Sequence, residues 1–313
     1  MIANTLFVAV TGGVIAFLAL CTVIALVLAR HARSPAARDT VANLNARVRS
    51  WRGIVFVFGA ALVFGSIVTL VLFAMLSFLS FREFMSLTPT RAGDHRSLFL
   101  SFFVVVPVQY WLIEIDWYGL FSIFIPVYVF LLLPALSAVA GDTSDFLTRN
   151  AKLQWGLMLT VFAISHAPAL LLLDLSGYRL PNALLLYLMI VVQISDVFQY
   201  VFGKLLGRTK LSPVISPSKT VEGLVGGGLT AVLIGAALSG ITPFSPLQAA
   251  EMSAVIGIGG FFGGFVLSAI KRDLGVKDWG SMIEGHGGIL DRIGSVAFAS
   301  PLFFHLTRYY FPS

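Results

Sequence analysis

Residues 6–29 read LFVAVTGGVIAFLALCTVIALVLA and contain no Asp, Glu, Lys or Arg. As a helix, this run rises about 36 Å at about 1.5 Å per residue, enough to cross about 30 Å of membrane hydrocarbon. It lacks a basic start and exceeds the roughly 7–15 apolar residues of a removable signal peptide. We therefore expect a retained transmembrane span.

The composition of the whole chain agrees with this interpretation. Apolar types (A, V, I, L, M, F, W, Y and C) make up 58% of the 313 residues and charged types 12%, against about 25% charged in soluble domains. Further apolar runs occupy residues 53–80, 98–113, 117–139, 154–173, 182–202, 223–241, 249–270 and 295–311. The expected fold is an all-α, polytopic integral membrane protein with about nine transmembrane helices.

Positive charge is concentrated in stretches between the apolar runs. The net charge is +6, and 19 of the 21 Lys and Arg lie within residues 30–52, 82–96, 149–152, 204–219 and 271–292. Basic loops between spans tend to remain cytoplasmic. We therefore expect a multi-pass protein of the inner (cytoplasmic) membrane, with its active loops facing the cytoplasm and no nucleic acid as partner.

The N-terminal topology is left open by this pattern. Run 53–80 separates two basic stretches that both favour the inner face. Either one of these stretches lies outside, or a run within 98–139 is divided differently. Loops 203–222 and 271–294 are separated by two spans, so we expect them to share one face.

Recognisable chemistry begins near residue 140. We therefore divide the chain into N-terminal transmembrane helices, 1–139, and a transmembrane catalytic region, 140–313. The single cysteine, Cys21, excludes disulfides and cysteine-ligated metals within the chain. His166, beside Pro168 in an apolar run, is either functional or a neutral, hydrogen-bonded histidine at a kink.

Asp196 interrupts a strongly apolar run, in the segment ISDVFQY at residues 194–200. An ionised carboxylate in lipid costs several kcal/mol, so it must face a wet cavity, a cation or a basic partner. We expect a functional role for Asp196, with structural pairing as the alternative.

The first polar loop lies between the runs that end near 202 and begin near 223. Ser216 followed by Pro217 is a favourable start for a helix. Hydroxyls, free backbone N–H groups and Lys219 would then converge at a positive helix end, which suits an anion. A capped connector without a ligand is the other interpretation.

The second polar loop, residues 268–295, concentrates cations, carboxylates, one histidine and several glycines in a chain that otherwise avoids charge. Gly285, Gly287 and Gly288 allow close approach of backbone N–H groups to phosphates. Asp278 and Asp291 offer the oxygen ligands that Mg²⁺ prefers. The four cations Lys271, Arg272, Lys277 and Arg292 could neutralise a polyphosphate. The pattern indicates phosphoryl or nucleotidyl transfer.

Two stretches together resemble a known family. They are SPSKTVEG at residues 216–223, with Asp196 upstream, and SAIKRDLGVKDWGSMIEGHGGILDR at residues 268–292. They are similar to the phosphatidate cytidylyltransferases, also called CDP-diglyceride synthases, and look like a bacterial paralogue branch of that family. The similarity covers roughly residues 140–313.

This resemblance implies a polytopic helical enzyme that condenses CTP with phosphatidic acid, giving CDP-diacylglycerol and pyrophosphate. The implied cofactor is Mg²⁺, with a second cation as an option, and the partners are the two substrates and the lipid bilayer, with a homodimer left open. The implied catalytic residues are Asp291, Asp278, Lys277 and His286, and the implied metal ligands are Asp291, Asp278 and Asp196. The implied substrate-binding residues are Asp196, Ser216, Ser218, Lys219, Thr220, Glu222, Ser268, Lys271, Arg272, Gly287, Gly288 and Arg292.

The chain departs from the family pattern in carboxylates that are expected near the metal. Gly264 and Gly294 stand where the family usually carries Asp, and Glu284 stands where Pro or Gly is common. The departures leave open a catalytically impaired relative that binds nucleotide or lipid phosphate without turnover. A lipid kinase that uses CTP and a transporter are weaker alternatives, the latter because we find no internal repeat.

Overall fold

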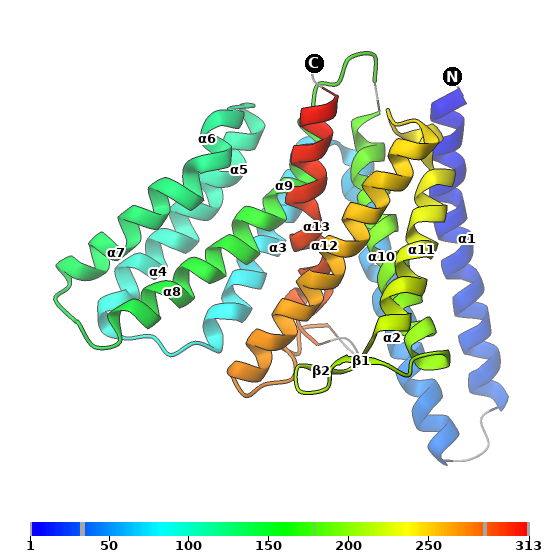
Figure 1. The fold of residues 1–313 in the computed structure, drawn as a ribbon, viewed down its shortest axis with the longest axis horizontal. Coiled ribbons are helices and arrows are strands. Elements are labelled where there is room, and N and C mark those ends of the chain that lie inside the picture. The colour runs from blue at the N-terminus through cyan, green and yellow to red at the C-terminus, as the bar shows by residue number, and fades with distance from the viewer. Residues whose placement is uncertain (1, 32–34, 179, 284–286, 312–313) are drawn as a thin grey trace.

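The computed structural model describes residues 2–31, 35–178, 180–283 and 287–311. This part of the chain is almost entirely helical and contains one two-stranded hairpin, so the expected all-α membrane class is confirmed (Figure 1). Short 3₁₀ and π-helical pieces are labelled η. The elements are α1 (Ile2–His31), α2 (Pro35–Phe64), α3 (Ser66–Ser86), η1 (Ala92–Asp94), α4 (His95–Leu100), η2 (Ser101–Val105), α5 (Val106–Glu114), α6 (Tyr118–Ile123), η3 (Phe124–Val129), α7 (Phe130–Val139), α8 (Phe146–Leu157), η4 (Met158–Phe162), α9 (Ala163–Ala169), η5 (Leu170–Leu172), α10 (Pro181–Leu205), β1 (Lys210–Ser212), β2 (Ser216–Thr220), α11 (Val221–Ala237), η6 (Ser239–Ile241), α12 (Pro246–Asp273) and α13 (Ile289–Tyr310).

Eight helical rods in the described residues are long and apolar enough to cross a membrane. In three of them the helix continues through a π-helical turn, as in α4–η2–α5. The ninth expected run corresponds to α11, which is shorter, at 17 residues. The eight rods are Thr5–His31, Ser66–Ser86, Ala92–Glu114, Tyr118–Val139, Phe146–Leu172, Asn182–Leu205, Pro246–Asp273 and Ile289–Tyr310. The chain is therefore a multi-pass membrane protein.

A break at Gly65 resolves the topology that the sequence left open. Gly65 has φ of +104°, a conformation that favours glycine, and it separates α2 from α3. Figure 1 shows α2 running away from the end that carries the β1–β2 hairpin, and α3 returning to it. The prediction of one span over 53–80 was wrong, because the chain turns back inside that run. The basic stretches on either side of it therefore lie at the same end.

We call this end of the molecule the hairpin end; both chain termini lie at the other (Figure 1). The links between α3 and α4 and between α7 and α8 also lie there, as do the C-terminal ends of α1 and α12. Within the described residues, all five basic stretches of the sequence come to this end. Such one-sided charge is typical of the cytoplasmic face of a membrane protein.

Glycines bring α12 and α13 into close contact. A Cβ atom at Gly263 would lie 2.8 Å from the carbonyl oxygen of Gly294, and one at Gly259 would lie 2.9 Å from Leu302 Cδ1. Small residues allow helix backbones to approach closely in membranes. This packing places the C-terminal turn of α12 beside the first turn of α13, where the second polar motif begins and ends.

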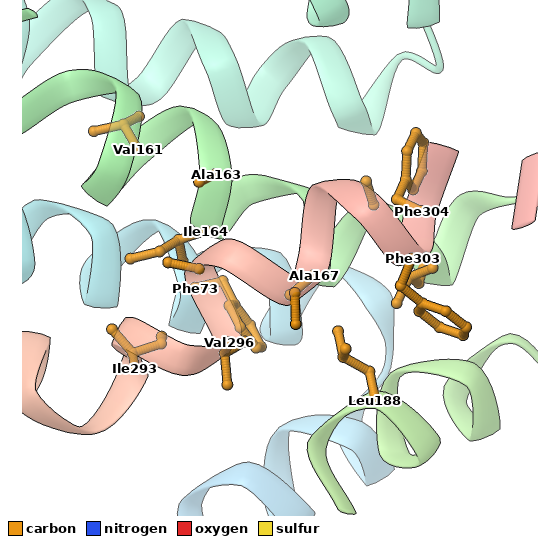
Figure 2. Packing of buried hydrophobic residues seen from close by; sticks show 14 of the residues in the cluster. Phe73, Val161, Ala163, Ile164, Ala167, Leu188, Ile293, Val296, Phe303 and Phe304 are labelled. Carbon is orange, nitrogen blue, oxygen red and sulfur yellow. The ribbon is translucent and has the colours of Figure 1, made fainter. Parts of the chain in front are cut away.

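The hydrophobic core includes residues from both sides of the expected boundary at 139/140. Phe73 of α3, Ile164 of α9, Leu188 of α10 and Val296 of α13 belong to one buried cluster (Figure 2). All four side chains are almost fully buried. The N-terminal helices therefore support α13 directly, and this contact positions the functional site.

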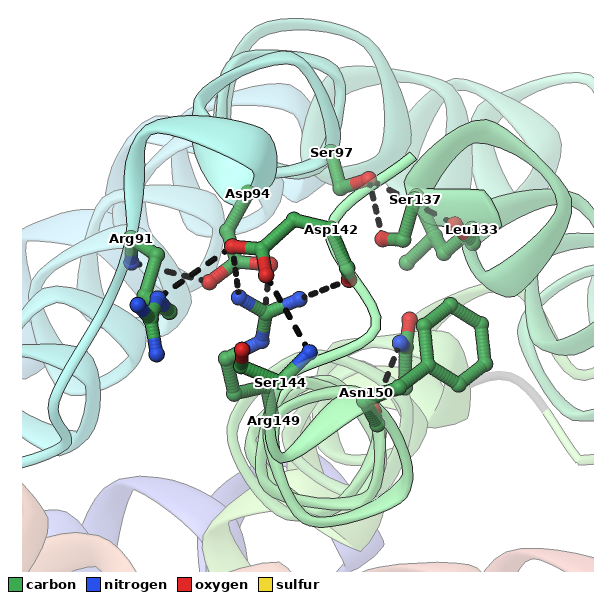
Figure 3. Close-up of polar contacts among 10 residues, drawn as sticks. Arg91, Asp94, Ser97, Leu133, Ser137, Asp142, Ser144, Arg149 and Asn150 are labelled. Carbon is green, nitrogen blue, oxygen red and sulfur yellow. Dashed lines mark hydrogen bonds and ion pairs between the residues drawn. The ribbon is translucent and has the colours of Figure 1, made fainter. Parts of the chain in front are cut away.

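A polar cluster fastens two links at the hairpin end. The guanidinium of Arg149 donates to Asp142 Oδ2 at 2.8 Å and to the Asp142 carbonyl at 2.9 Å, and its Nε lies 3.5 Å from Asp94 Oδ1 (Figure 3). Arg91 Nε lies 3.2 Å from the same Asp142 carboxylate. The bond from Arg149 holds the pKa of the Asp142 carboxyl below its usual value. We call Arg91, Asp94, Asp142 and Arg149 the Arg149 cluster; it ties the α3–α4 and α7–α8 links to α8.

Candidate functional site

The two polar motifs predicted from the sequence lie at the hairpin end (Figure 1). We expected the first motif to begin a helix at Ser216, and this prediction was wrong. Residues Ser216–Thr220 form β2 and pair antiparallel with β1, because this pairing satisfies backbone groups that a helix would otherwise satisfy. The helix α11 begins at Val221, and Thr220 caps it by accepting the N–H of Gly223 at 3.1 Å.

Among the described carboxylates of the second motif, Asp291 makes the most hydrogen bonds. Its Oδ1 accepts a hydrogen bond from the Lys271 ammonium at 2.6 Å. Its Oδ2 accepts hydrogen bonds from the backbone N–H groups of Trp279 at 2.8 Å and Gly288 at 3.0 Å. The Lys271 and Asp291 side chains are 14% and 5% exposed. Asp291 thus ties together α12, the α12–α13 link and the first turn of α13.

Lys219 reaches from β2 toward α12. Its Nζ donates to the Phe261 carbonyl at 3.1 Å and lies 4.4 Å from the centre of the Phe261 ring. Asp196 of α10 interacts with this ammonium electrostatically and accepts a hydrogen bond from Ser295 of α13. Burial lowers the pKa of Lys219 to about 8, while the charge of Asp196 acts in the opposite direction. The basic groups that act on Asp196 are therefore Lys219 and Arg292.

The two glycines that replace expected carboxylates have different surroundings. A Cβ atom at Gly264 would lie 3.1 Å from Lys219 Nζ and 3.7 Å from Ser295 Oγ. A Cβ atom at Gly294 would overlap Leu267 Cδ1, which belongs to a buried apolar side chain. A cation therefore lies beside the first glycine, and an apolar side chain fills the space at the second.

Arg292 follows Asp291 in the first turn of α13 and lies among charges from several elements. The carboxylates of Asp291, Asp196 and Asp278 act on its guanidinium, as does the positive charge of Arg47 from α2. The basic half of α2 thus reaches the same place as the two motifs. We call Lys219, Lys271, Arg292 and Arg47 the basic cluster.

Several expected substrate-binding residues make contacts within the protein. Glu222 accepts the backbone N–H groups of Arg208 and Thr209 at 3.1–3.2 Å, which fastens the start of the hairpin to α11. Ser268 donates to the Gly264 carbonyl at 2.6 Å, and Arg272 donates to the Val276 carbonyl at 3.0 Å. These contacts explain the positions of the three residues without a ligand.

The remaining predicted residues differ in exposure. Ser216 is buried, whereas Ser218, Lys277 and Asp278 are exposed at the surface of the hairpin end. Predicted residue His286, with Glu284 and Gly285, lies outside the described residues. Ser218, Lys277 and Asp278 are thus accessible to a water-soluble substrate.

Gly287 and Gly288 admit carboxylates of the protein itself. Gly287 has φ of +81°, and a Cβ atom there would lie 2.8 Å from Asp291 Oδ2 and 3.4 Å from Asp278 Cβ. A Cβ atom at Gly288 would contact the Glu83 carboxylate. We expected these glycines to admit substrate phosphates, but in the described structure they make room for Asp291 and Glu83.

By themselves, the described side chains do not form a complete Mg²⁺ site, since Mg²⁺ usually keeps waters and substrate phosphates as further ligands. Within residues 2–31, 35–178, 180–283 and 287–311, no three His, Cys, Asp or Glu side chains come together as metal ligands. Both oxygens of Asp291 already accept hydrogen bonds, one from an ammonium group, and glycine at 264 and 294 supplies no oxygen. Mg²⁺ stays a prediction, and we assign it no step in the reaction.

Sequence reasoning missed Glu83 of α3. Its carboxylate, from the N-terminal half of the chain, hydrogen-bonds the backbone at the start of α13. The available signal was a single acid near the end of an apolar run, within the segment FREF at residues 81–84. Nothing in the spacing of the motifs connects it to residues more than 200 positions away.

His166 lies away from this site. It packs with Phe121, Phe304 and His305, and its Nδ1 lies 2.7 Å from the Phe162 carbonyl. Of the two interpretations of His166, these contacts fit the buried, hydrogen-bonded histidine.

Known proteins resemble most of this chain. The model of the cytidylyltransferase family matches residues 45–310. The chain is 41% identical over 265 residues to an Escherichia coli K12 protein named uncharacterized protein YnbB, covering 84% of this chain and 87% of that protein. It is 40% identical over 120 residues to phosphatidate cytidylyltransferase of Staphylococcus haemolyticus and 39% to that of Staphylococcus aureus strain COL. These two alignments cover 38% of this chain and 46% of each relative, about half its length. The resemblance seen in the motifs is thus confirmed, and the chain belongs to the cytidylyltransferase family.

Proposed function

We propose that this protein transfers a cytidylyl group from CTP to phosphatidate, giving CDP-diacylglycerol and pyrophosphate for phospholipid synthesis. The observation that carries the proposal is the basic cluster at the hairpin end of a membrane protein of the cytidylyltransferase family. A lipid-phosphate acceptor remains in the membrane while CTP arrives from water, so a site at the end of the helices suits both.

The reaction joins two anions. An oxygen of the lipid phosphate attacks the α-phosphorus of CTP, and the bond from that phosphorus to the oxygen bridging to the β-phosphorus breaks. Pyrophosphate leaves with the bonding electron pair, so no protein nucleophile is required. The basic cluster would lower the repulsion between the reactants and hold them in line.

Within this proposal, Lys271 and Arg292 neutralise the phosphates of CTP, and Lys219 faces the phosphate that becomes bonded to the cytidylyl group. Asp291 orients Lys271 through their 2.6 Å hydrogen bond. Asp196 and Ser295 fix the side of the site that Lys219 faces. Exposed Lys277 supplies further positive charge near the entrance.

We further propose that the hairpin end faces the cytoplasm across the inner membrane. The concentration of basic stretches at this end supports that orientation. CTP is then on the correct side of the membrane. Cysteine labelling from either side, at an introduced Lys210→Cys with Cys21 replaced, tests the orientation.

The proposed activity is tested by incubating purified protein with CTP, phosphatidate and a divalent cation. The expected product is a CDP-lipid, and Asp291→Ala should abolish it. Absence of a CDP-lipid across several lipid phosphates and divalent cations would overturn the proposal.

A second candidate is nucleotide binding without turnover, favoured by the glycines at 264 and 294 and by the engagement of Asp291 with Lys271. It predicts saturable CTP binding with no product. It also predicts turnover once both glycines become Asp, for which Leu267 must move away from residue 294. If the double replacement changes neither metal affinity nor rate, this candidate loses its basis.

A further inference from the structure

Glu83 connects the N-terminal helices to the start of α13. Its side chain lies near the hairpin end of α3, is 6% exposed, and accepts two backbone N–H groups. Oε1 accepts that of Ile289, and Oε2 that of Leu290, each at 2.9 Å. These are the first two N–H groups of α13, which have no acceptor within their own helix.

The segment before α13 is shaped to receive this carboxylate. A Cβ atom at Gly280 would lie 3.0 Å from Glu83 Oε1, and one at Gly288 would lie 2.5 Å from Oε2. Next to Glu83, Phe84 stacks on Trp279, with ring centres 5.2 Å apart and planes at 22°. Trp279 is 2% exposed. Two consecutive residues of α3 thus hold the link and the helix that follows it.

A helix end does not need so distant a partner. Asp291 already satisfies the N–H of Gly288 from within the same helix, as a local cap. Adding Glu83 satisfies the next two N–H groups and places a negative charge at the positive end of α13. The consequence is that this end is fixed relative to α3, and not only capped.

The first turns of α13 carry residues of the candidate site. Asp291 meets Lys271 of α12, and Ser295 meets Asp196 of α10. A shift of this helix end moves both contacts together. Misplacement of a reacting geometry by about 1 Å can cost roughly 100-fold in rate.

We infer that Glu83 is a positioning residue of the cytidylyl transfer: its carboxylate holds the first turn of α13 so that Asp291 and Ser295 keep Lys271 and Asp196 in place. This inference rests on the function proposed above. In this arrangement, the backbone N–H groups of residues 288–290 already donate hydrogen bonds to the carboxylates of Asp291 and Glu83. Substrate phosphates are then bound by the side chains of the basic cluster and not by the N-terminus of α13.

Two variants of Glu83 and one control test the inference. In Glu83→Ala, kcat for CDP-lipid formation falls roughly 10–100-fold, the usual range for a residue that orients a catalytic group, while KM for CTP changes less than threefold. Glu83→Gln keeps one acceptor oxygen and loses the other, so its kcat lies between those of Glu83→Ala and the unaltered protein. Glu251→Gln alters an exposed acid on α12 and keeps the unaltered kcat.

Rescue by formate distinguishes two causes of a lower rate in Glu83→Ala: a misplaced helix α13 and a smaller amount of folded protein. Added to purified Glu83→Ala, formate can enter the space left by the side chain, accept the N–H groups of Ile289 and Leu290, and restore at least fivefold of the lost rate. Formate has no such effect on Glu83→Gln, whose amide fills the space. Two results overturn the inference: activity of both variants equal to that of Glu251→Gln, or a loss of rate in Glu83→Ala that formate does not restore.

Hydrogen exchange of the backbone amides in residues 287–293 measures the contact of Glu83 with α13 independently of enzymatic activity. These amides exchange at least tenfold faster in Glu83→Ala, and unchanged exchange overturns the inference. If the unaltered protein forms no CDP-lipid, the proposed function fails, and the contact of Glu83 with α13 is then judged from hydrogen exchange alone. Faster exchange of residues 287–293 in Glu83→Ala supports that Glu83 holds the start of α13, and unchanged exchange contradicts it.

Discussion

The Arg149 cluster and the basic cluster lie at the same end of the molecule, and both place cations beside carboxylates. The Arg149 cluster contains two arginines and two aspartates that pair with one another. In the basic cluster, four cations act among the three carboxylates Asp196, Asp278 and Asp291. The first is balanced in charge, whereas the second keeps a surplus of positive charge.

The geometry of the cations differs as well. Arg149 directs its guanidinium at a carboxylate and a carbonyl of one loop, an arrangement that fixes the loop. Lys219 instead donates to a helix carbonyl and lies over the faces of two phenylalanine rings, at 4.4 and 5.9 Å from their centres. The comparison teaches that the role of a charged cluster follows from the balance between its cations and its carboxylates. A balanced cluster joins elements, and a cluster with surplus positive charge suits a polyanionic substrate.

The largest expected effect is on the rate when Lys271 is removed. Lys271→Ala should lower kcat/KM for CDP-lipid formation roughly 100-fold, since a cation that stabilises developing charge contributes about that much. Lys210→Ala removes an equal charge from an exposed position of β1 and serves as the control. Equal losses in the two variants would show that only overall charge matters.

The next effect is a dependence on pH that Lys219 predicts. Its pKa of about 8 means that the side chain is an ammonium below that pH and a neutral amine above it. At pH 9 about a tenth of it stays charged, so kcat/KM should fall roughly tenfold between pH 7 and pH 9. Lys219→Arg stays charged throughout this range, and its profile should remain flat. A flat profile of the unaltered protein contradicts the assignment.

A smaller effect, on stability, distinguishes the two glycines. Gly294→Asp forces a side chain against buried Leu267 and should lower the free energy of unfolding by about 1–3 kcal/mol, the usual cost of overpacking. Gly264→Asp meets the flexible ammonium of Lys219 and should change stability little. Thermal unfolding in detergent measures both. If Gly294→Asp unfolds at the temperature of the unaltered protein, the packing around residue 294 is wrong.

The smallest effect on catalysis is expected in the Arg149 cluster. Arg149→Met removes the cation that both aspartates share, so the protein should unfold at a lower temperature. Because this cluster is charge-balanced and serves the links, kcat of the folded protein should not change. A loss of kcat larger than the loss of folded protein would remove the distinction between the clusters.

The sequence predicted the class of fold and singled out two polar motifs, which the structure places at the hairpin end. Apolar runs located the spans because crossing a bilayer requires helices of a minimum length. The motifs containing Lys219 and Asp291 were found because charge is costly in such a chain. Ser216 misled us because a favourable helix cap can also begin a strand, and tertiary pairing with β1 decided between them.

The rest depends on contacts that have no local pattern. The turn at Gly65 has a single glycine as its signal, and the run around it is apolar on both sides. Glu83 meets α13 only because α3 and α13 pack together. Leu267 beside Gly294 likewise follows from the approach of α12 to α13.

The most direct measurement is a product analysis with CTP labelled separately at the α- and γ-phosphates, in the unaltered protein and in Lys271→Ala. The account predicts the α-label in a CDP-lipid and the γ-label in an equal amount of pyrophosphate, with both products reduced roughly 100-fold in the variant. The γ-label in the lipid with release of CDP, or bound CTP with no labelled lipid at all, would contradict it.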